Sequence, residues 1–181
     1  MIESHKLEVL ISGEDMQKRI REIAAEINRE YKGQSLVVVG ILKGAVLFYA
    51  DLVRQLDMDV RFDFMTISSY GGGTESSGEV RIRKDLDTSI RDKHVLIVED
   101  IIDSGLTLTN LRQVLSTRQP ASLRICCMLD KPSRRKVEIK PDYCCFEIPD
   151  KYVVGYGLDF DQWGRQFSDV FCVKPEYIDT L

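Results

Sequence analysis

The chain has 181 residues, of which 44% are hydrophobic and 30% charged, and its formal net charge is −4. This composition excludes collagen-like, low-complexity and disulfide-stapled chains and supplies enough apolar side chains for a proper core. A mildly acidic chain is also a poor match to non-specific nucleic-acid or membrane-surface binding, which needs surplus Lys and Arg. We therefore expect one domain over residues 1–181, with no nucleic-acid and no membrane partner.

The cysteines and the start of the chain indicate a compartment. The five cysteines include the adjacent pairs Cys126-Cys127 and Cys144-Cys145, both within apolar runs, and no CxxC occurs. Such cysteines are most simply buried free thiols of a reducing compartment. The first residues lack a signal-peptide core, and the apolar run Leu36–Leu42 is too short to cross a bilayer. The expected location is the cytoplasm.

The first elements alternate between helix and strand. Apolar residues at helical spacing from Met16 to Ile27 predict an amphipathic helix, with Ser12 and Asp15 as a variant capping box before it. The continuous run Leu36–Leu42 predicts a strand covered on both faces. Residues 45–56 are apolar nearly all round, which predicts a buried helix.

Two alternating segments then flank a glycine-rich stretch. Apolar residues at positions 60, 62 and 64 alternate with Arg61 and Asp63, and those at 80 and 82 alternate with arginines. Both patterns predict a strand with one solvated face. Residues 71–78 hold four Gly and two Ser, which predicts a mobile loop of about 69–80 between antiparallel strands.

The second half continues the alternation. Residues 95–98 predict a buried strand, and leucines at 108, 111 and 115 predict a helix. Residues 123–129 and 143–148 predict further strands, whereas the last 30 or so residues fit neither period. The alternation implies an α/β fold with an open, mostly parallel twisted sheet flanked by helices.

The most informative residues follow the strand 95–98. Two carboxylates, Glu99 and Asp100, come directly after four apolar residues, and burying unpaired charge is costly. Ser104, Gly105 and Thr107 then precede a helix, where hydroxyls and backbone N–H groups can hold a phosphate. Ligands bind at this edge of open α/β sheets, so the pattern predicts a sugar-phosphate site.

This stretch also permits other interpretations. Asp103 and Ser104 are also common helix N-cap residues, although that role leaves Glu99 and Asp100 unexplained. The chain has no GxxxxGK[ST] motif and no GxGxxG motif after a strand, so P-loop kinase and Rossmann dehydrogenase interpretations lose their main support.

Four segments resemble one family. The run from Val95 to Leu108 closely resembles the phosphoribosyl-pyrophosphate motif of type I phosphoribosyltransferases, and within them the members acting on hypoxanthine and guanine. Leu42-Lys43-Gly44, Ser69-Tyr70 and the segment from Phe146 to Asp159 also match, in order, over nearly the whole chain. The resemblance implies a single phosphoribosyltransferase domain, with a small hood formed by the N-terminal segment and about 145–181.

The resemblance assigns the strand end to phosphoribosyl pyrophosphate. Glu99 and Asp100 would hold the ribose 2- and 3-hydroxyls, directly or through Mg²⁺. Asp103 would be the general base near N7 of the purine. The 5-phosphate loop would consist of Ser104, Gly105, Leu106 and Thr107. Leu106 replaces a longer or charged residue of many relatives, but its backbone N–H would still serve.

The remaining motifs are assigned to the leaving group and the purine. Pyrophosphate would contact Lys43, Gly44 and Arg165, and the Leu42–Lys43 peptide is cis in many family members. The purine would contact the side chains of Lys131, at its 6-oxo group, and Tyr152, by stacking, together with the backbone of Val153 and with Asp159.

Two further assignments concern the metal and the loop. Asp159 would bind a second Mg²⁺, so that the metal-ligating residues would be Glu99, Asp100 and Asp159. Ser69 and Tyr70 would lead the glycine-rich loop over the site.

The implied reaction joins a 6-oxopurine base to the phosphoribosyl group, releasing pyrophosphate, with Mg²⁺ as cofactor. Family habit indicates a homodimer or homotetramer. The choice among hypoxanthine, guanine and xanthine depends on backbone geometry around Val153 and Asp159. A rival interpretation is an RNA-binding regulator built on the same fold with a nucleotide as signal, against which stand the net charge and the match to a purine pocket.

Without the resemblance, several of these residues have ordinary structural interpretations. Lys43 fits a solvated turn, Lys131 a surface loop, and Arg165 a surface position. Tyr152 and Tyr156 fit a core. Asp159 and Asp161 fit the first turn of a helix. We assign no site role to the basic residues Arg134, Arg135 and Lys136 or to Arg81, Arg83 and Lys84, and we expect them to be solvated or at subunit contacts. We expect His5 and His94 to be structural.

Overall fold

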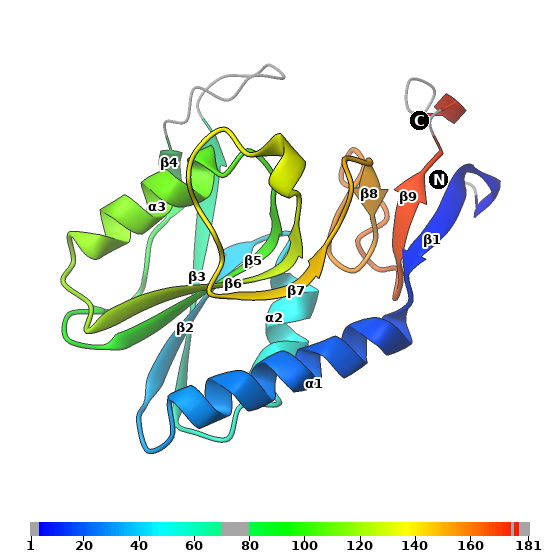
Figure 1. The fold of residues 1–181 in the computed structure, drawn as a ribbon. Helices are drawn as coiled ribbons and strands as arrows, with labels where there is room; N and C mark the ends of the chain where they lie inside the picture. Colours follow the sequence, from blue (N-terminus) through cyan, green and yellow to red (C-terminus); the bar gives the residue numbers. More distant parts are fainter. Residues whose placement is uncertain (1–3, 70–79, 175, 178–181) are drawn as a thin grey trace.

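A computed structural model describes residues 4–69, 80–174 and 176–177, and a six-stranded sheet forms its centre (Figure 1). The strand order is β4-β3-β2-β5-β6-β7, and every neighbouring pair is parallel except β3 with β4. The strands are β2 (Leu36–Leu42), β3 (Val60–Ser69), β4 (Val80–Lys84), β5 (His94–Ile102), β6 (Ser122–Asp130) and β7 (Tyr143–Glu147). The predicted mostly parallel α/β sheet is confirmed.

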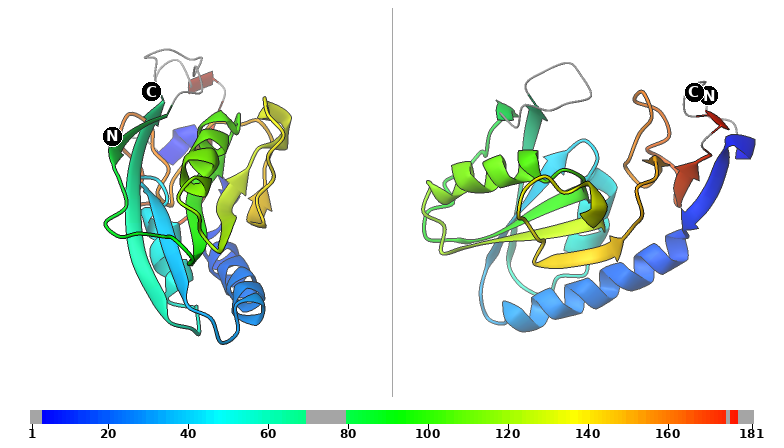
Figure 2. Two further views of the ribbon diagram at one scale, coloured as in Figure 1. Left: turned by 90° about the vertical axis from the view of Figure 1, so that its left-hand side faces the viewer. Right: turned by 45° about the horizontal axis from the view of Figure 1, so that its top comes forward.

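Helices cover both faces of this sheet. The helices α1 (Gly13–Glu30) and α2 (Val46–Val53) pack on one face, and α3 (Leu106–Ser116) packs on the other (Figures 1 and 2). Successive residues of β2 point to opposite faces, so Val38 joins the core under α1 and α2 while Val39 joins the core under α3. This two-sided burial explains why β2 and β5 appear as continuous apolar runs.

A small antiparallel sheet lies beside the carboxyl end of the large one (Figure 1). Its order is β1-β9-β8, so a strand near the start of the chain pairs with strands near the end. The strands are β1 (Leu7–Ile11), β8 (Val153–Val154) and β9 (Val170–Val173), and short 3₁₀ turns cover Ser4–Lys6 and Pro132–Arg134. The chain ends therefore build a separate layer over the strand ends.

The start of α1 follows its sequence signal. The backbone N–H of Asp15 donates to the Ser12 hydroxyl at 3.1 Å, and that hydroxyl donates to the Asp15 carboxylate at 2.6 Å. The pair thus satisfies a free N–H group at the helix start, as the capping pattern predicts.

One face of β3 was predicted wrongly. Phe62 is 57% exposed and Asp63 only 2% exposed, the reverse of the expected alternation. The Asp63 carboxylate accepts the backbone N–H groups of Phe64 and Asp87, at 2.8 and 3.0 Å. It is therefore a satisfied buried charge, and Phe62 packs edge-on against Tyr49.

The remaining fold-level expectations are mixed. The strands before and after the glycine-rich stretch are antiparallel, as predicted, but residues 70–79 lie outside the described residues. All five cysteines are free thiols, and four of them are buried. Among the described helices, none has the length and apolar character needed to span a bilayer.

Candidate functional site

The carboxyl ends of β2 and β5 meet at one edge of the large sheet. These strands are parallel neighbours, with Gly40 beside Val98, so the residues that follow them lie side by side. A Cβ placed on Gly44 would collide with the carboxylate of Asp100. Only glycine therefore allows the chain after β2 to approach this carboxylate so closely.

Glu99 and Asp100 form a buried acidic pair at this edge. The Oε2 atom of Glu99 is buried without a hydrogen-bond partner. Burial, followed by the charge of Asp100, raises the pKa of Glu99 well above its usual value. Burial raises the pKa of Asp100 to about 6, although the backbone N–H of Ile101 partly opposes the shift. Two carboxyls held so unfavourably in the free protein are suited to binding hydroxyl donors or a cation.

The predicted phosphate loop lies directly beyond this pair. Gly105 adopts a left-handed conformation, with φ of 81°, and is the N-cap of α3. A pocket of about 220 Å³ is lined by residues 99–105 together with Thr107 and Leu108. The N-cap residue Gly105 has no side chain, and the N–H of Leu106 reaches the Ser104 hydroxyl only at 3.4 Å, so the backbone N–H groups at the start of α3 are available to an anion there.

This geometry excludes one interpretation of Asp103, that of a helix cap. The N-cap of α3 is Gly105, so the carboxylate of Asp103 is not a helix cap. Instead it accepts a hydrogen bond from Nε of Arg134 at 2.7 Å, and 45% of its side chain is exposed. An exposed carboxylate beside the pocket is accessible to a ligand proton.

Lys131 follows β6 on the next strand end. It is 8% exposed, and its backbone N–H donates to the carbonyl of Ile102 at 2.9 Å. The surface-loop interpretation of this lysine is therefore wrong, and this hydrogen bond joins the ends of β5 and β6 next to the predicted site residues.

The two tyrosines differ in environment. Tyr152 is 41% exposed, with its ring 5.4 Å from that of Phe160 in an edge-to-face arrangement. Tyr156 is buried, and its hydroxyl donates to Asp51 and accepts from Gln17. Tyr156 therefore fits the structural interpretation, whereas the ring of Tyr152 is accessible from the surface.

A chain of tight turns, residues 155–165, brings the last predicted residues to the same edge. This turn segment contains three glycines and also Tyr156, Asp161 and Gln162 at positive φ. Asp159 lies outside any helix, between the bridge residues Leu158 and Phe160, so the interpretation of Asp159 as a helix start is wrong. A Cβ on Gly157 would collide with the carbonyl of Gly44, so the turn segment rests on the loop after β2.

Polar contacts join this turn segment to the rest of the site. Arg165 pairs with the carboxylate of Asp159 at 2.5 Å and donates to the carbonyl of Gly157 at 2.7 Å. The ammonium of Lys43 donates to the side chain of Gln162 at 3.1 Å. The Leu42–Lys43 peptide is cis. Sequence reasoning missed Gln162, whose side-chain oxygen accepts from both Lys43 and Arg165, the two cations predicted to bind pyrophosphate. No motif pointed to this residue.

Other predicted residues fall outside or beside this cluster. Ser69 ends β3 and pairs with Val80, whereas Tyr70 lies outside the described residues. Val153 is buried in β8. The expectation that Arg134 and Arg135 are solvated or at subunit contacts misses their contacts with Asp103, through its carboxylate and its carbonyl respectively.

The acidic residues of the site could supply some, but not all, of the ligands of a magnesium ion. In the described ranges, no three His, Cys, Asp or Glu side chains form a group that could enclose a metal. Mg²⁺ is usually held by one or two carboxylates plus waters and substrate oxygens, so a full protein cage is not required. The unpartnered buried oxygen of Glu99, beside Asp100, is suited to that kind of site.

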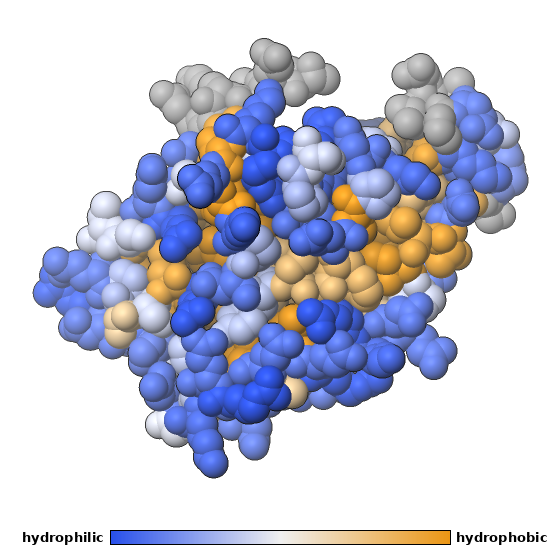
Figure 3. Space-filling view, viewed as in Figure 1, coloured by the Kyte–Doolittle hydropathy of each residue, from blue (hydrophilic) through white to orange (hydrophobic). Residues whose placement is uncertain are grey.

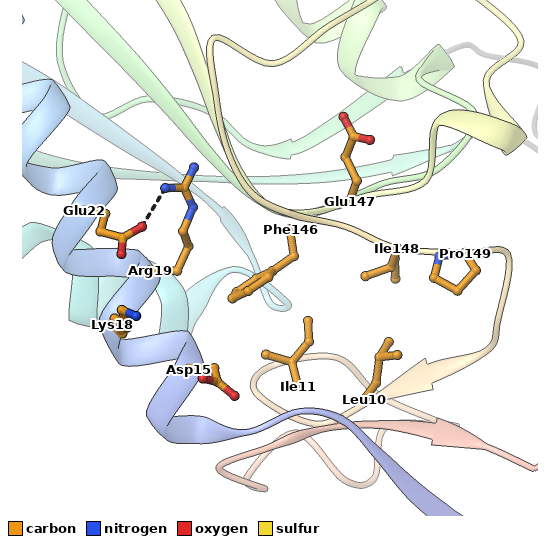
Figure 4. Close-up of a pocket in the computed structure, with 10 residues that line it drawn as sticks. All are labelled: Leu10, Ile11, Asp15, Lys18, Arg19, Glu22, Phe146, Glu147, Ile148 and Pro149. Atoms are coloured by element: carbon orange, nitrogen blue, oxygen red, sulfur yellow. Dashed lines mark hydrogen bonds and ion pairs between the residues drawn. The ribbon is translucent and has the colours of Figure 1, made fainter.

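A separate cavity of about 440 Å³ lies between the start of α1 and the segment after β7 (Figure 4). Apolar side chains gather on this part of the surface in Figure 3, and those lining the cavity include Leu10, Ile11, Phe146 and Ile148. None of the predicted site residues lines it. We assign it no role in the chemistry at the strand ends.

Comparisons with known proteins agree on one family. The model of the phosphoribosyl transferase domain matches residues 10–161. A hypoxanthine phosphoribosyltransferase of Haemophilus influenzae is 52% identical over 170 residues, covering 92% of this chain and 95% of that protein. A hypoxanthine-guanine phosphoribosyltransferase of Bacillus subtilis is 49% identical over 177 residues, covering 97% and 98%.

A solved structure agrees with these sequence matches. The crystal structure of a hypoxanthine phosphoribosyltransferase from Staphylococcus aureus superposes with a TM-score of 0.93 at 46% identity, covering 96% of this chain and 95% of that one. The similarity therefore extends over both the large sheet and the sheet made by the chain ends.

Proposed function

The chain belongs to the phosphoribosyl transferase family, and from that premise we propose which residues carry each part of its reaction. The enzyme has hypoxanthine-guanine phosphoribosyltransferase activity in purine salvage. It transfers the 5-phosphoribosyl group of phosphoribosyl pyrophosphate to N9 of a 6-oxopurine, giving the nucleoside monophosphate and pyrophosphate. The roles below are those that the family resemblance implies, and the geometry and charges of the strand-end edge support them.

The pentose binds at the end of β5. Glu99 and Asp100 accept hydrogen bonds from the ribose 2- and 3-hydroxyls, which gives the unpartnered oxygen of Glu99 a donor. The 5-phosphate occupies the 220 Å³ pocket, where the left-handed turn at Gly105 exposes the first N–H groups of α3. Residues 104–107 form this phosphate loop.

The leaving group binds across the junction of the loop after β2 and the turn segment. Lys43, the backbone of Gly44 and Arg165 supply positive charge and N–H donors for pyrophosphate. The contact of Lys43 with Gln162 and the pair of Arg165 with Asp159 hold these cations at the edge before substrate arrives. Cations placed in advance stabilise the charge that develops on the departing pyrophosphate.

The purine binds between β6 and the turn segment. The buried ammonium of Lys131 donates to the 6-oxo group, and the exposed ring of Tyr152 stacks on the base. Val153, through its backbone, and Asp159 meet the far edge of the base. A lysine donates but cannot accept, so the pocket favours a 6-oxo over a 6-amino purine.

Asp103 moves the proton. Its carboxylate is 45% exposed, and Asp103 lines the phosphate pocket. It accepts the imidazole proton at N7 as N9 attacks C1 of the ribose. Ser69 and Tyr70 lead a loop that excludes water from the cation-like C1 centre.

Enzymes of this family generally use Mg²⁺ with phosphoribosyl pyrophosphate. Glu99, Asp100 and Asp159 are the residues that would hold the ion in this chain. When bound, Mg²⁺ neutralises the charge of the pyrophosphate group.

Three further properties belong to the proposal. The enzyme works in the cytoplasm, consistent with five free thiols. It forms a homodimer or homotetramer, which light scattering of the purified protein would distinguish. The sheet of the chain ends, with the segment around it, acts as a hood over the strand-end edge in a single domain.

One observation carries the assignment of the site: buried acids and a helix start with a glycine at its N-cap meet at one strand end. A spectrophotometric assay with phosphoribosyl pyrophosphate, Mg²⁺ and each of hypoxanthine, guanine, xanthine and adenine tests it. We expect turnover of hypoxanthine and guanine and little of adenine. Equal turnover of adenine would contradict the role given to Lys131.

A further inference from the structure

Two consecutive arginines of the segment after β6 occupy different environments. The side chain of Arg134 is 49% exposed and pairs with the carboxylates of Asp103 and Asp150. The side chain of Arg135 is only 14% exposed. Burying a guanidinium is costly unless its N–H groups are satisfied, so the partners of Arg135 show what it is there to hold.

The first partner of Arg135 is a buried carboxylate at the end of β6. Asp130 is 6% exposed, and its side chain pairs with Nη2 of Arg135. Asp130 immediately precedes Lys131, the residue proposed to contact the 6-oxo group. A buried carboxylate without this cation would be strongly destabilised, so the pair fixes the last residue of β6.

The second partner lies on the neighbouring strand end. Nη1 of Arg135 donates to the backbone carbonyl of Asp103 at 2.5 Å. Asp103 directly follows β5, whose last residue, Ile102, is in register with Asp130. One guanidinium therefore joins the two strand ends that carry the phosphate loop and the purine-contacting lysine.

The residues that follow Arg135 pack against the phosphate loop. The backbone N–H of Lys136 donates to the carbonyl of Ser104 at 2.9 Å. A Cβ on Gly105 would lie 2.6 Å from the side chain of Ile139, 3.0 Å from Arg135 and 3.2 Å from Val137. Residues 135–139, here called the brace segment, thus pack directly against the turn that exposes the helix N–H groups.

We propose that Arg135 is a positioning residue, which holds Asp103 and the phosphate loop at a fixed distance from Lys131 through its two bonds. The proposal rests on the roles given above to Asp103 and Lys131. The planar fork of arginine reaches two acceptors on different strand ends, whereas the ammonium of a lysine is a single point charge. Because small misplacements of reacting groups are costly in rate, the brace affects catalysis without touching substrate.

Steady-state kinetics of Arg135→Gln and Arg135→Lys test this role. We expect Arg135→Gln to lower kcat about 10- to 100-fold and to raise KM for phosphoribosyl pyrophosphate about tenfold. Arg135→Lys retains the charge beside Asp130 but loses one bond, so its losses should be intermediate. Lys136→Gln is the matched control, because it removes an exposed cation of the same segment and keeps the backbone N–H; its constants should stay within about twofold of wild type.

Two measurements separate positioning from simple loss of folding. Kinetics are taken below the melting temperature of every variant, and methylguanidinium is added to Arg135→Ala, where it should restore part of kcat. Calorimetry of ribose 5-phosphate, which involves no turnover, should show about tenfold weaker binding in Arg135→Gln. Inhibition by pyrophosphate, which binds on the other side of the site, should change less than about twofold.

Clear results would overturn the proposal. If folded Arg135→Gln has kcat, KM and ribose 5-phosphate affinity within threefold of wild type, Arg135 holds nothing that the site uses. If only the melting temperature falls, the arginine stabilises the fold alone. If the wild-type protein makes no nucleoside monophosphate, the proposed function fails on its own, and the ribose 5-phosphate titration still decides whether Arg135 positions the loop.

Discussion

The strand-end edge and the turn segment 155–165 supply the two halves of the site by different physical means. At the edge, residues 99–107 lead from the buried strand β5 into the helix α3, so the pairing of the sheet fixes the backbone positions of these residues. In the turn segment, no regular helix or strand sets the geometry. Positive-φ residues and contacts with the loop after β2 set it instead.

This difference assigns different tasks to the two regions. A parallel sheet with both faces buried is rigid, which suits groups that must align a proton acceptor and a phosphate. The turn segment is held by a few contacts, such as Gly157 against Gly44 and Arg165 with Asp159. Changes at the edge should therefore affect chemistry and base choice, whereas changes in the turn segment should affect stability and binding of the leaving group.

The largest effect is expected from Asp103→Asn at the edge. Asparagine keeps the shape of the side chain but cannot accept the purine proton, so kcat should fall about 10²- to 10⁴-fold with a small change in KM for phosphoribosyl pyrophosphate. Asp150→Asn is the matched control, because Asp150 shares the partner Arg134 but lies outside the proposed site. Steady-state assays of both variants measure this difference. An unchanged kcat for Asp103→Asn would show that another residue is the base.

In the turn segment, Gly157→Ala should lower stability. Its φ is 99°, and the added Cβ would collide with the carbonyl of Gly44, so backbone strain and overpacking together should cost about 2–5 kcal/mol. Displacement of the Gly44 loop should also raise KM for phosphoribosyl pyrophosphate. Gly33→Ala is the control, with positive φ but open space around it. Equal losses of melting temperature in the two variants would show that the contact between the regions is unimportant.

Lys131→Met tests whether the edge alone selects the base. Loss of a charged hydrogen bond should lower kcat/KM for hypoxanthine about 10- to 100-fold, while adenine is affected far less. Lys151 is an exposed lysine next to Tyr152, so Lys151→Met is the control. It should leave the ratio of kcat/KM for hypoxanthine to that for adenine unchanged within about twofold. If the ratio of kcat/KM for hypoxanthine to kcat/KM for adenine is unchanged in Lys131→Met, residues of the turn segment select the base instead.

The smallest effect concerns the pH dependence of the ligand-free edge. The pKa of Asp100 is raised to about 6, so the native state binds a proton more tightly than the unfolded chain. The free energy of unfolding should therefore fall as pH rises from about 4 to 6, by on the order of 2 kcal/mol from this group. Urea titrations should show less of this slope in Asp100→Asn.

The control for that titration is Asp161→Asn, an exposed carboxylate of the turn segment. It should keep the wild-type slope between pH 4 and 6. If Asp100→Asn also keeps it, then Asp100 is not the buried acid that the edge geometry implies.

The sequence predicted the edge much better than the turn segment. Leu36–Leu42 matches β2 residue for residue, because a strand buried on both faces leaves a continuous apolar run. Residues 153–173 form short strands and turns that depend on pairing with β1 across the chain, and such long-range contacts leave no local period. The resemblance to a family, rather than periodicity, pointed to Asp159 and Arg165.

The errors have the same physical origin. Asp63 can be buried because its carboxylate accepts the backbone N–H of Asp87, a residue 24 positions away, which the alternation of β3 could not show. Arg135 looked like one more basic residue in a charged run, and its importance depends on the burial of Asp130 and the carbonyl of Asp103. A buried carboxylate at a strand end, followed within five residues by arginine, is a signal that could have identified it.

The most direct test of the account is a crystal structure with inosine monophosphate bound. We expect the 5-phosphate within hydrogen-bond distance of the N–H groups of residues 104–107, and the ribose hydroxyls at Glu99 and Asp100. A nucleotide seated elsewhere, for example in the cavity between α1 and the segment after β7, would contradict the central claim that the edge of β5 binds the pentose phosphate.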